Sequence, residues 1–228
     1  MTVRPPRRAL SFKRRLLKWY RKVGRDLPWR RSSDPYEILV SEFMLQQTQV
    51  SRVQDYYPRF LGRYPTIEAL SRATPSQVRE SWDGLGYYRR AENLHRLSRI
   101  VMQEHDGVLP SQPDALKRLP GVGTYTAGAI STFAYRRRTP AVDTNAERVM
   151  RRVFLPRLDA GAAAARRIRH LVQSLLPVNG DAAWEFNQGL MDLGATICTA
   201  RTPRCHACPI RPACATGRPR TRRSRADR

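Results

Sequence analysis

The sequence has no run of 18 apolar residues, and its basic N-terminus leads into no apolar segment like that of a secretion signal. It also has no alternating run of strand length and no internal repeat at the periods of solenoid proteins. We therefore expect an intracellular, cytoplasmic protein that does not bind membranes. The missing strand pattern favours an all-α fold.

Acidic residues are scarce. The 228 residues include 19 Asp and Glu against 42 Lys and Arg, a formal net charge of +23. Residues 1–25 hold ten basic residues and no acidic one, and residues 217–228 hold six Arg and one Asp. Such a balance indicates a polyanionic partner, although each terminus alone could be a solvated basic surface or a membrane-facing patch. Residues 217–228 have almost no apolar side chain, so we expect a disordered basic tail there.

Hydrophobic residues make up 41% of the chain, too many for a disordered protein. They recur at helical spacing in eight segments, and proline and glycine fall between these segments. The pattern predicts helices over 11–23, 35–47, 51–62, 89–104, 124–135, 145–154, 163–176 and 182–197.

Cysteine is also rare, but its few copies lie together. The only four, Cys198, Cys205, Cys208 and Cys214, fall within 17 residues as C-x6-C-x2-C-x5-C. Without a secretion signal we expect metal-bound thiolates rather than disulfides. Zinc remains an alternative, but one short and two longer gaps are more typical of a cubane iron-sulfur cluster. The interleaved Arg201, Arg204 and Arg211 predict that this loop also offers donors to phosphates.

A short segment between two predicted helices has the composition of a tight turn. It contains Leu119, Gly121, Val122, Gly123 and Thr124, with Pro120 ending the first helix. The exposed backbone N–H groups of such a turn, next to a helix N-terminus, predict a phosphate-binding hairpin. An ordinary corner between two helices is the alternative.

Two carboxylates stand out. Glu42 shares a helix face with Ile38 and Leu45, so its carboxyl should point inward, and burial would raise its pKa and keep it protonated as a general acid. A buried Glu paired with an Arg is the alternative. Asp143 precedes a helix, where it could be a plain N-cap or an ionised group that stabilises a positively charged sugar.

The Leu119–Thr124 hairpin, Asp143 and the cysteine spacing together resemble the endonuclease III superfamily of helix-hairpin-helix DNA glycosylases, over about residues 20–216. The segments 41–48, 84–88 and 186–188 are similar to MutY-type adenine glycosylases. The resemblance implies two helical lobes with DNA in the cleft between them. These are a six-helix barrel with the hairpin at 34–144 and a cluster lobe with a 4Fe-4S loop at 145–216. Residues 1–33 would join the cluster lobe, ahead of the tail at 217–228.

The resemblance also implies roles for single residues. Glu42 matches the proton donor to the adenine ring, and Asp143 the carboxylate that stabilises the sugar cation or adds to it. Gln47 and Tyr87 match the residues that enter the duplex. The residues that match the walls and polar edge of the base pocket are Trp29, Arg30, Leu45 and Gln188. From sequence alone Tyr87 could equally be a core aromatic. Tyr125 occupies the position of the lysine that forms a Schiff base in bifunctional relatives, so a monofunctional enzyme is expected.

The expected partner is double-stranded DNA with a mismatch, bound by a monomer that in a bacterium would associate with the nucleoid. A monovalent cation on the hairpin carbonyls is a further candidate ligand. Full-length adenine glycosylases of this type carry a C-terminal domain that reads the opposite 8-oxoguanine, and we expect none here.

Thr144 stands where those adenine glycosylases usually have Gly. In this respect the chain resembles the Mig-type thymine glycosylases instead. Against that, residues 45–48 and the pair Tyr87 and Tyr88 follow the adenine pattern, so adenine removal from A:G or A:8-oxoguanine is the leading hypothesis. Removal of thymine or uracil from T:G or U:G is the alternative, and a non-catalytic or redox-sensing DNA-binding iron-sulfur protein is a third.

Overall fold

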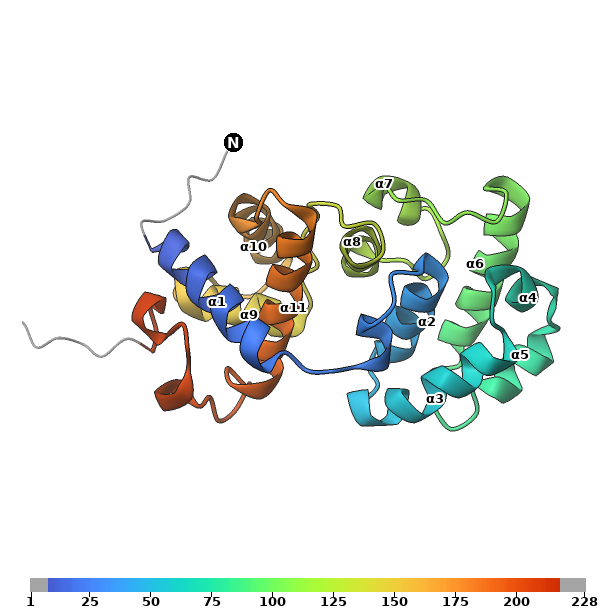
Figure 1. Cartoon of the computed structure of the whole chain (residues 1–228), viewed down its shortest axis with the longest axis horizontal. Coiled ribbons are helices and arrows are strands. Elements are labelled where there is room, and N and C mark those ends of the chain that lie inside the picture. Colours follow the sequence, from blue (N-terminus) through green and yellow to red (C-terminus); the bar gives the residue numbers. More distant parts are fainter. Residues whose placement is uncertain (1–7, 218–228) are drawn as a thin grey trace, which may run out of the picture. The chain divides into compact units, whose positions relative to one another are not determined.

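The computed structural model describes residues 8–217, and these are helical with no strand, which confirms the all-α prediction (Figure 1). The α-helices are α1 (Ala9–Val23), α2 (Pro35–Leu45), α3 (Val50–Arg63), α4 (Ile67–Arg72), α5 (Pro75–Ser81), α6 (Arg89–Glu104), α7 (Pro113–Leu116), α8 (Thr124–Phe133), α9 (Thr144–Phe154), α10 (Ala162–Leu175) and α11 (Gly180–Thr196). Three 3₁₀ turns accompany them: η1 (Pro28–Arg30), η2 (Cys205–Ala207) and η3 (Arg211–Ala213).

The chain forms two compact units. Unit 1 comprises residues 1–24, 142–177 and 185–228, and unit 2 comprises residues 25–141 and 178–184. The prediction places residues 1–33 with the cluster region and ends the barrel at 144. Residues 25–33 instead belong to unit 2, together with the first turn of α11. Most of the predicted basic tail lies outside the described residues.

Unit 2 is built around α2. Every residue from Tyr36 to Met44 is buried except Glu37, and a helix that is apolar on nearly all sides has to be enclosed by others. α2 packs against α3, α6 and α8. The side chain of Asp34 starts the helix, because Oδ1 accepts hydrogen bonds from the backbone N–H of Tyr36 at 2.7 Å and of Glu37 at 3.1 Å.

Unit 1 is held by an aromatic and aliphatic core. α1 buries Phe12, Leu16 and Tyr20, which recur every four residues along one face. The ring of Phe12 meets Phe154 of α9 edge-on at 5.1 Å and Phe186 of α11 at 6.1 Å between centroids. α1, α9 and α11 therefore share one core. The cysteine loop follows directly after α11 in the chain.

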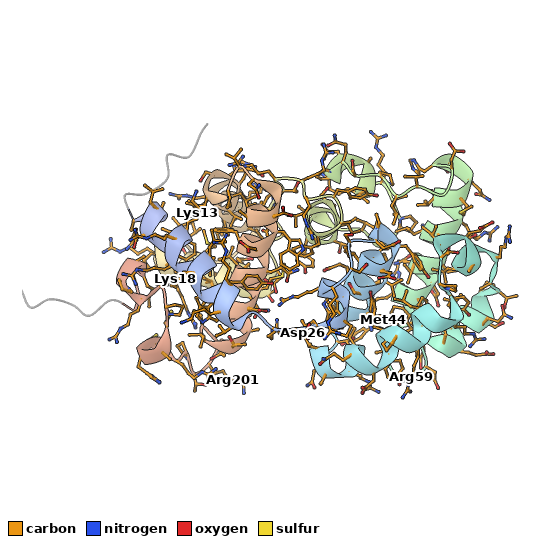
Figure 2. The ribbon with its side chains drawn as sticks, in the orientation of Figure 1. Lys13, Lys18, Asp26, Met44, Arg59 and Arg201 are labelled. Atoms are coloured by element: carbon orange, nitrogen blue, oxygen red, sulfur yellow. The ribbon has the colours of Figure 1, made fainter. Side chains whose placement is uncertain are left out.

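None of the helices within residues 8–217 is long and apolar enough to cross a membrane. Figure 2 shows where some of the charged side chains lie, with Lys13 and Lys18 on α1, Arg59 on α3 and Arg201 on the loop after α11. Basic side chains are thus present on both units.

Candidate functional site

Glu42 lies in the interior of unit 2, as its position on α2 predicts. Only 4% of the residue is exposed, and the neighbouring Ser41 is 1% exposed. The Ser41 hydroxyl donates to the carbonyl of Ile38 at 2.8 Å. The inward position predicted for this side chain from the helix face is thus confirmed.

Three predicted pocket residues lie close to α2 or at its end. Trp29 is 7% exposed and packs edge-on against Tyr57 at 5.7 Å between ring centroids. Nη1 of Arg30 donates to the carbonyl of Arg25 at 3.0 Å. Leu45, the last residue of α2, is partly exposed. Trp29 thus packs in the core of unit 2.

The two residues predicted to enter the duplex share an unusual backbone. Gln47 has φ 58° and Tyr87 has φ 49°, both in the left-handed region that side-chain-bearing residues seldom adopt. Both are exposed, Tyr87 to 60%. The alternative of a core aromatic is therefore wrong for Tyr87.

The predicted hairpin joins α7 to α8, and its two exposed glycines differ. Gly121 has φ 75°, and a Cβ there would lie 2.9 Å from the ring of Phe43, so this position requires glycine. Gly123 caps α8 with φ −85°, and a Cβ there would meet nothing within 4 Å. The turn itself therefore does not require Gly123.

The hairpin leaves the N-terminus of α8 open. No side chain caps this helix end, and Gly123, Thr124 and Gly121 are exposed, while Leu119 and Val122 are buried beneath them. Backbone N–H groups at such an end form an anion site. Tyr125, the second residue of α8, is half-buried and adjoins it.

Asp143 belongs to unit 1, where it is the N-cap of α9. Its Oδ1 accepts from the backbone N–H of Ala146 at 2.7 Å, and its Oδ2 accepts from Nδ2 of Asn145 at 2.8 Å. The proposed catalytic aspartate is thus also a structural cap, and the carboxylate is only partly buried. Both roles considered from the sequence remain compatible.

Sequence reasoning missed a hydrogen-bonded path from Asp143 to the cysteine loop. Nη2 of Arg148 donates to Oδ1 of Asn145 at 2.8 Å and to the carbonyl of Gly194 at 2.7 Å. Its Nε donates to the carbonyl of Cys198 at 2.8 Å. The position of Arg148 one helical turn beyond Asn145 is the only sequence signal that could have indicated it.

The four cysteines line one cavity of about 290 Å³ in unit 1, and none forms a disulfide. Apolar side chains from α9 and the loop, Val153 and Ile210 among them, complete its wall. Among residues 8–217 no three His, Cys, Asp or Glu side chains form a site for a single metal ion. Burial raises the pKa of the Cys208 thiol to about 11, an effect that coordination to a metal would reverse.

Donors point at two of the four sulfurs. Nη1 of Arg152 lies 3.4 Å from Sγ of Cys198, and the backbone N–H of Gly217 lies 3.3 Å from Sγ of Cys214. N–H groups in contact with cysteine sulfur are the kind of environment that tunes iron-sulfur clusters. Four thiols around one cavity with such donors fit a cluster of this kind.

The arginines between the cysteines divide into two groups. Arg204 donates to the carbonyl of Thr196, and Nε of Arg211 donates to that of Gly217 at 3.1 Å. Arg201 is exposed and lies at the cavity rim. Arg204 and Arg211 therefore also hold the loop itself, and the prediction that the loop offers donors to phosphate stays a prediction.

Gln188, predicted at the edge of the base pocket, is 5% exposed in α11 between the buried Asn187 and Leu190. Gln188 and Asp143 lie in unit 1, whereas Glu42, Gln47 and Tyr87 lie in unit 2. Each unit thus contributes part of the predicted set.

Helices joined by a glycine hairpin, together with a four-cysteine loop, define a class of helical proteins suited to binding phosphate and a metal cluster. A family model described as "HhH-GPD superfamily base excision DNA repair protein" matches residues 40–176. The chain belongs to this superfamily, which confirms the family indicated by its motifs.

Named relatives point the same way. The chain is 48% identical over 196 residues to the adenine DNA glycosylase of Mycobacterium tuberculosis. The alignment covers 86% of this chain and 64% of that protein. The chain is 40% identical over 214 residues to the adenine DNA glycosylase of Homo sapiens, covering 90% of this chain and 39% of that one. The chain therefore spans less than two thirds of the length of these curated relatives.

A solved structure of a thermostable thymine-DNA glycosylase superposes with a TM-score of 0.85 at 31% identity. The match covers 92% of this chain and 96% of that one.

Proposed function

We propose that the protein is a DNA glycosylase of base-excision repair that hydrolyses the N-glycosidic bond of adenine opposite guanine or 8-oxoguanine. The observation that carries this proposal is the 48% identity to a named adenine DNA glycosylase over 86% of the chain. The burial of Glu42 and the exposure of Gln47 and Tyr87 support it from the structure.

The proposed chemistry divides between two carboxyl groups. Glu42 gives a proton to the adenine ring, so that the bond from the sugar C1′ breaks with its electron pair moving to a neutral leaving base. The carboxylate of Asp143 stabilises the positive charge that develops on the sugar, and water then adds its hydroxyl to C1′ and releases a proton. The product is an abasic site in an uncut strand, because Tyr125 has no amine to form a Schiff base.

The proposed DNA contacts use features of both units. The backbone N–H groups at Gly123 and Thr124 hold a phosphate, and the surplus of basic side chains adds affinity that does not depend on sequence. Gln47 and Tyr87 occupy the space that a flipped base leaves in the duplex. Trp29, Arg30, Leu45 and Gln188 are proposed to line or border the base pocket.

We further propose that Cys198, Cys205, Cys208 and Cys214 hold a 4Fe-4S cluster. A cavity of about 290 Å³ suits a group of eight atoms better than a single zinc ion, whose sulfur ligands all lie about 2.3 Å away. Bound there, the cluster would cross-link the loop and supply a redox-active centre. Iron and acid-labile sulfide should each approach about four per chain after anaerobic purification. One equivalent of zinc without iron would contradict the assignment.

Removal of thymine from T:G mismatches is the second candidate, supported by the TM-score of 0.85 to a thymine-DNA glycosylase. A duplex panel separates the two. Labelled duplexes with A:8-oxoguanine, A:G, T:G or U:G are incubated with the protein and treated with hot alkali, which cuts only at abasic sites. Breaks at the adenine strands are expected. Breaks at T:G and U:G alone would replace adenine with thymine or uracil as the target.

Asp143→Asn provides the test of mechanism. Asparagine can still cap α9 through its side-chain oxygen, so the fold should persist, whereas the negative charge is lost. Base release should fall by at least about 100-fold with duplex affinity nearly unchanged. Wild-type rates in this variant would remove Asp143 from the chemistry.

A further inference from the structure

The strained conformations of Gln47 and Tyr87 need something to maintain them. Four non-glycine residues in the described part of the chain have positive φ, and these are two of the four. Such a backbone persists only where its surroundings hold it. Because both side chains are exposed, their own packing does not supply that hold.

Arg90 contacts the turns that carry both residues. It is the second residue of α6 and only 7% exposed. On the side of Gln47, its Nη1 donates to the carbonyls of Met44 at 2.7 Å, of Phe43 at 3.0 Å and of Gln46. These carbonyls end α2, where helix geometry leaves them without partners in their own helix.

On the side of Tyr87, the same guanidinium reaches the preceding loop. Nη2 donates to the carbonyl of Gly86 at 3.0 Å and more weakly to that of Leu85 at 3.4 Å, and Nε lies 3.4 Å from the carbonyl of Tyr87. The guanidinium carbon also lies 5.5 Å from the ring centroids of Tyr87 and Trp82. One buried cation therefore connects the backbone on both sides.

The shape of arginine matters for this connection. A guanidinium has five N–H donors in a fixed plane, so it can serve two groups of carbonyls that face it from different directions. A lysine ammonium has three donors at a single point and cannot reach both groups together. The charge also suits the C-terminal end of α2, where the helix dipole is negative.

We propose that Arg90 is a positioning residue that fixes Gln47 and Tyr87 in their exposed conformations before DNA arrives. The inference rests on the proposed function, in which these two side chains enter the duplex. Because both turns are held in advance, binding need not supply the free energy to order them. Arg90 itself does not touch the DNA in this scheme.

The first test measures the turns without DNA. Hydrogen exchange is followed in peptides covering residues 45–49 and 84–88 for the wild type, Arg90→Lys, Arg90→Gln and Arg99→Gln. The last variant removes the same charge from an exposed position on α6. In both Arg90 variants exchange should rise by at least about 10-fold in the two peptides and stay unchanged in α8. Wild-type exchange in both Arg90 variants would overturn the proposal. If Arg90→Gln does not fold, Arg90→Lys decides, since it keeps the charge.

The second test asks whether Arg90 acts through the two exposed residues. Single-turnover base release is measured for Arg90→Lys in the wild-type background and in the double variant Gln47→Ala, Tyr87→Ala. We expect a loss of about 10- to 100-fold in the first background and less than about 3-fold in the second, as for residues that work as one unit. Equal losses in both backgrounds would mean that Arg90 acts in some other way, and would overturn the proposal.

The two tests also separate this inference from the function on which it rests. If the wild type releases no base from any duplex, the proposed glycosylase activity fails, and the exchange experiment alone decides the role of Arg90. If the wild type is active and Arg90→Lys is indistinguishable from it in both tests, the glycosylase survives and the positioning role does not.

Discussion

At the scale of single residues, Tyr125 carries a sharp chemical expectation. It is the second residue of α8, half-buried beside the open hairpin, and its phenol cannot form a Schiff base. A primary amine at the same position would be next to the helix N-terminus, where the positive end of the helix dipole favours the neutral, nucleophilic form of an amine. The side chain at 125 therefore decides whether the proposed abasic product is cut.

We predict that Tyr125→Lys gains lyase activity. Strand breaks should appear without alkali, and borohydride should trap a covalent protein–DNA complex that the wild type does not form. Tyr125→Phe keeps the ring without the hydroxyl and should release base and leave the strand intact, like the wild type. Absence of any trapped complex with Tyr125→Lys, in a variant that still releases base, would show that residue 125 does not face the sugar.

The sequence indicates Glu42 and Asp143 because their chemistry follows from local position. The helical stripe of α2 predicts the burial of Glu42, and a helix start predicts the capping by Asp143. The positioning contacts of Arg90 and Arg148 could not be predicted in this way. Each depends in part on carbonyls more than 40 positions away in the chain, and the spacing of Arg148 from Asn145 is only a weak local signal.

At the scale of elements, the eight segments with clear helical periodicity all correspond to helices, α1, α2, α3, α6, α8, α9, α10 and α11. The pattern missed α4, α5 and α7, which have six, seven and four residues. Helices of one or two turns are too short to repeat an apolar face, so periodicity cannot identify them. Caps at Thr66 and Thr74 were the available signals for α4 and α5.

The hairpin provides a matched pair of substitutions at this scale. Gly121→Ala places a methyl group against Phe43 at a left-handed φ, and should destabilise unit 2 by about 1–3 kcal/mol. Gly123→Ala meets no atom within 4 Å at φ −85°, so its thermal unfolding should match the wild type within about 0.5 kcal/mol.

For DNA binding, the variant with unchanged stability, Gly123→Ala, should be the one that shows a defect. The methyl group of Gly123→Ala would stand on the open face where a phosphate approaches the N-terminus of α8, and duplex affinity should fall by about 3- to 10-fold. Affinity is measured by fluorescence anisotropy below the unfolding temperature of each variant. Unchanged affinity in Gly123→Ala would argue that the hairpin is only a corner between helices.

At the scale of the whole molecule, the net charge of +23 overstates the surface available to a polyanion. Several arginines instead hold the protein's own carbonyls, as Arg90 does in unit 2 and Arg148, Arg152 and Arg204 do in unit 1. An arginine bonded to internal carbonyls adds to the field around the protein but has fewer N–H donors left for a phosphate. The salt dependence of DNA binding should therefore reflect a subset of the basic residues.

Arg201 and Arg204 test this distinction within one loop. Arg201 is exposed at the rim of the cysteine cavity, whereas Arg204 donates to the carbonyl of Thr196 at the end of α11. Arg201→Ala should leave thermal unfolding unchanged and reduce the slope of log affinity against log salt concentration by about 1, the loss of one phosphate contact. Arg204→Ala should leave that slope nearly unchanged but lower the unfolding temperature, because the carbonyl at the helix end loses its donor.

Duplex affinities at four salt concentrations, with unfolding curves for each variant, supply both quantities. Equal slopes for Arg201→Ala and the wild type would place the phosphate contacts of unit 1 away from the cysteine loop.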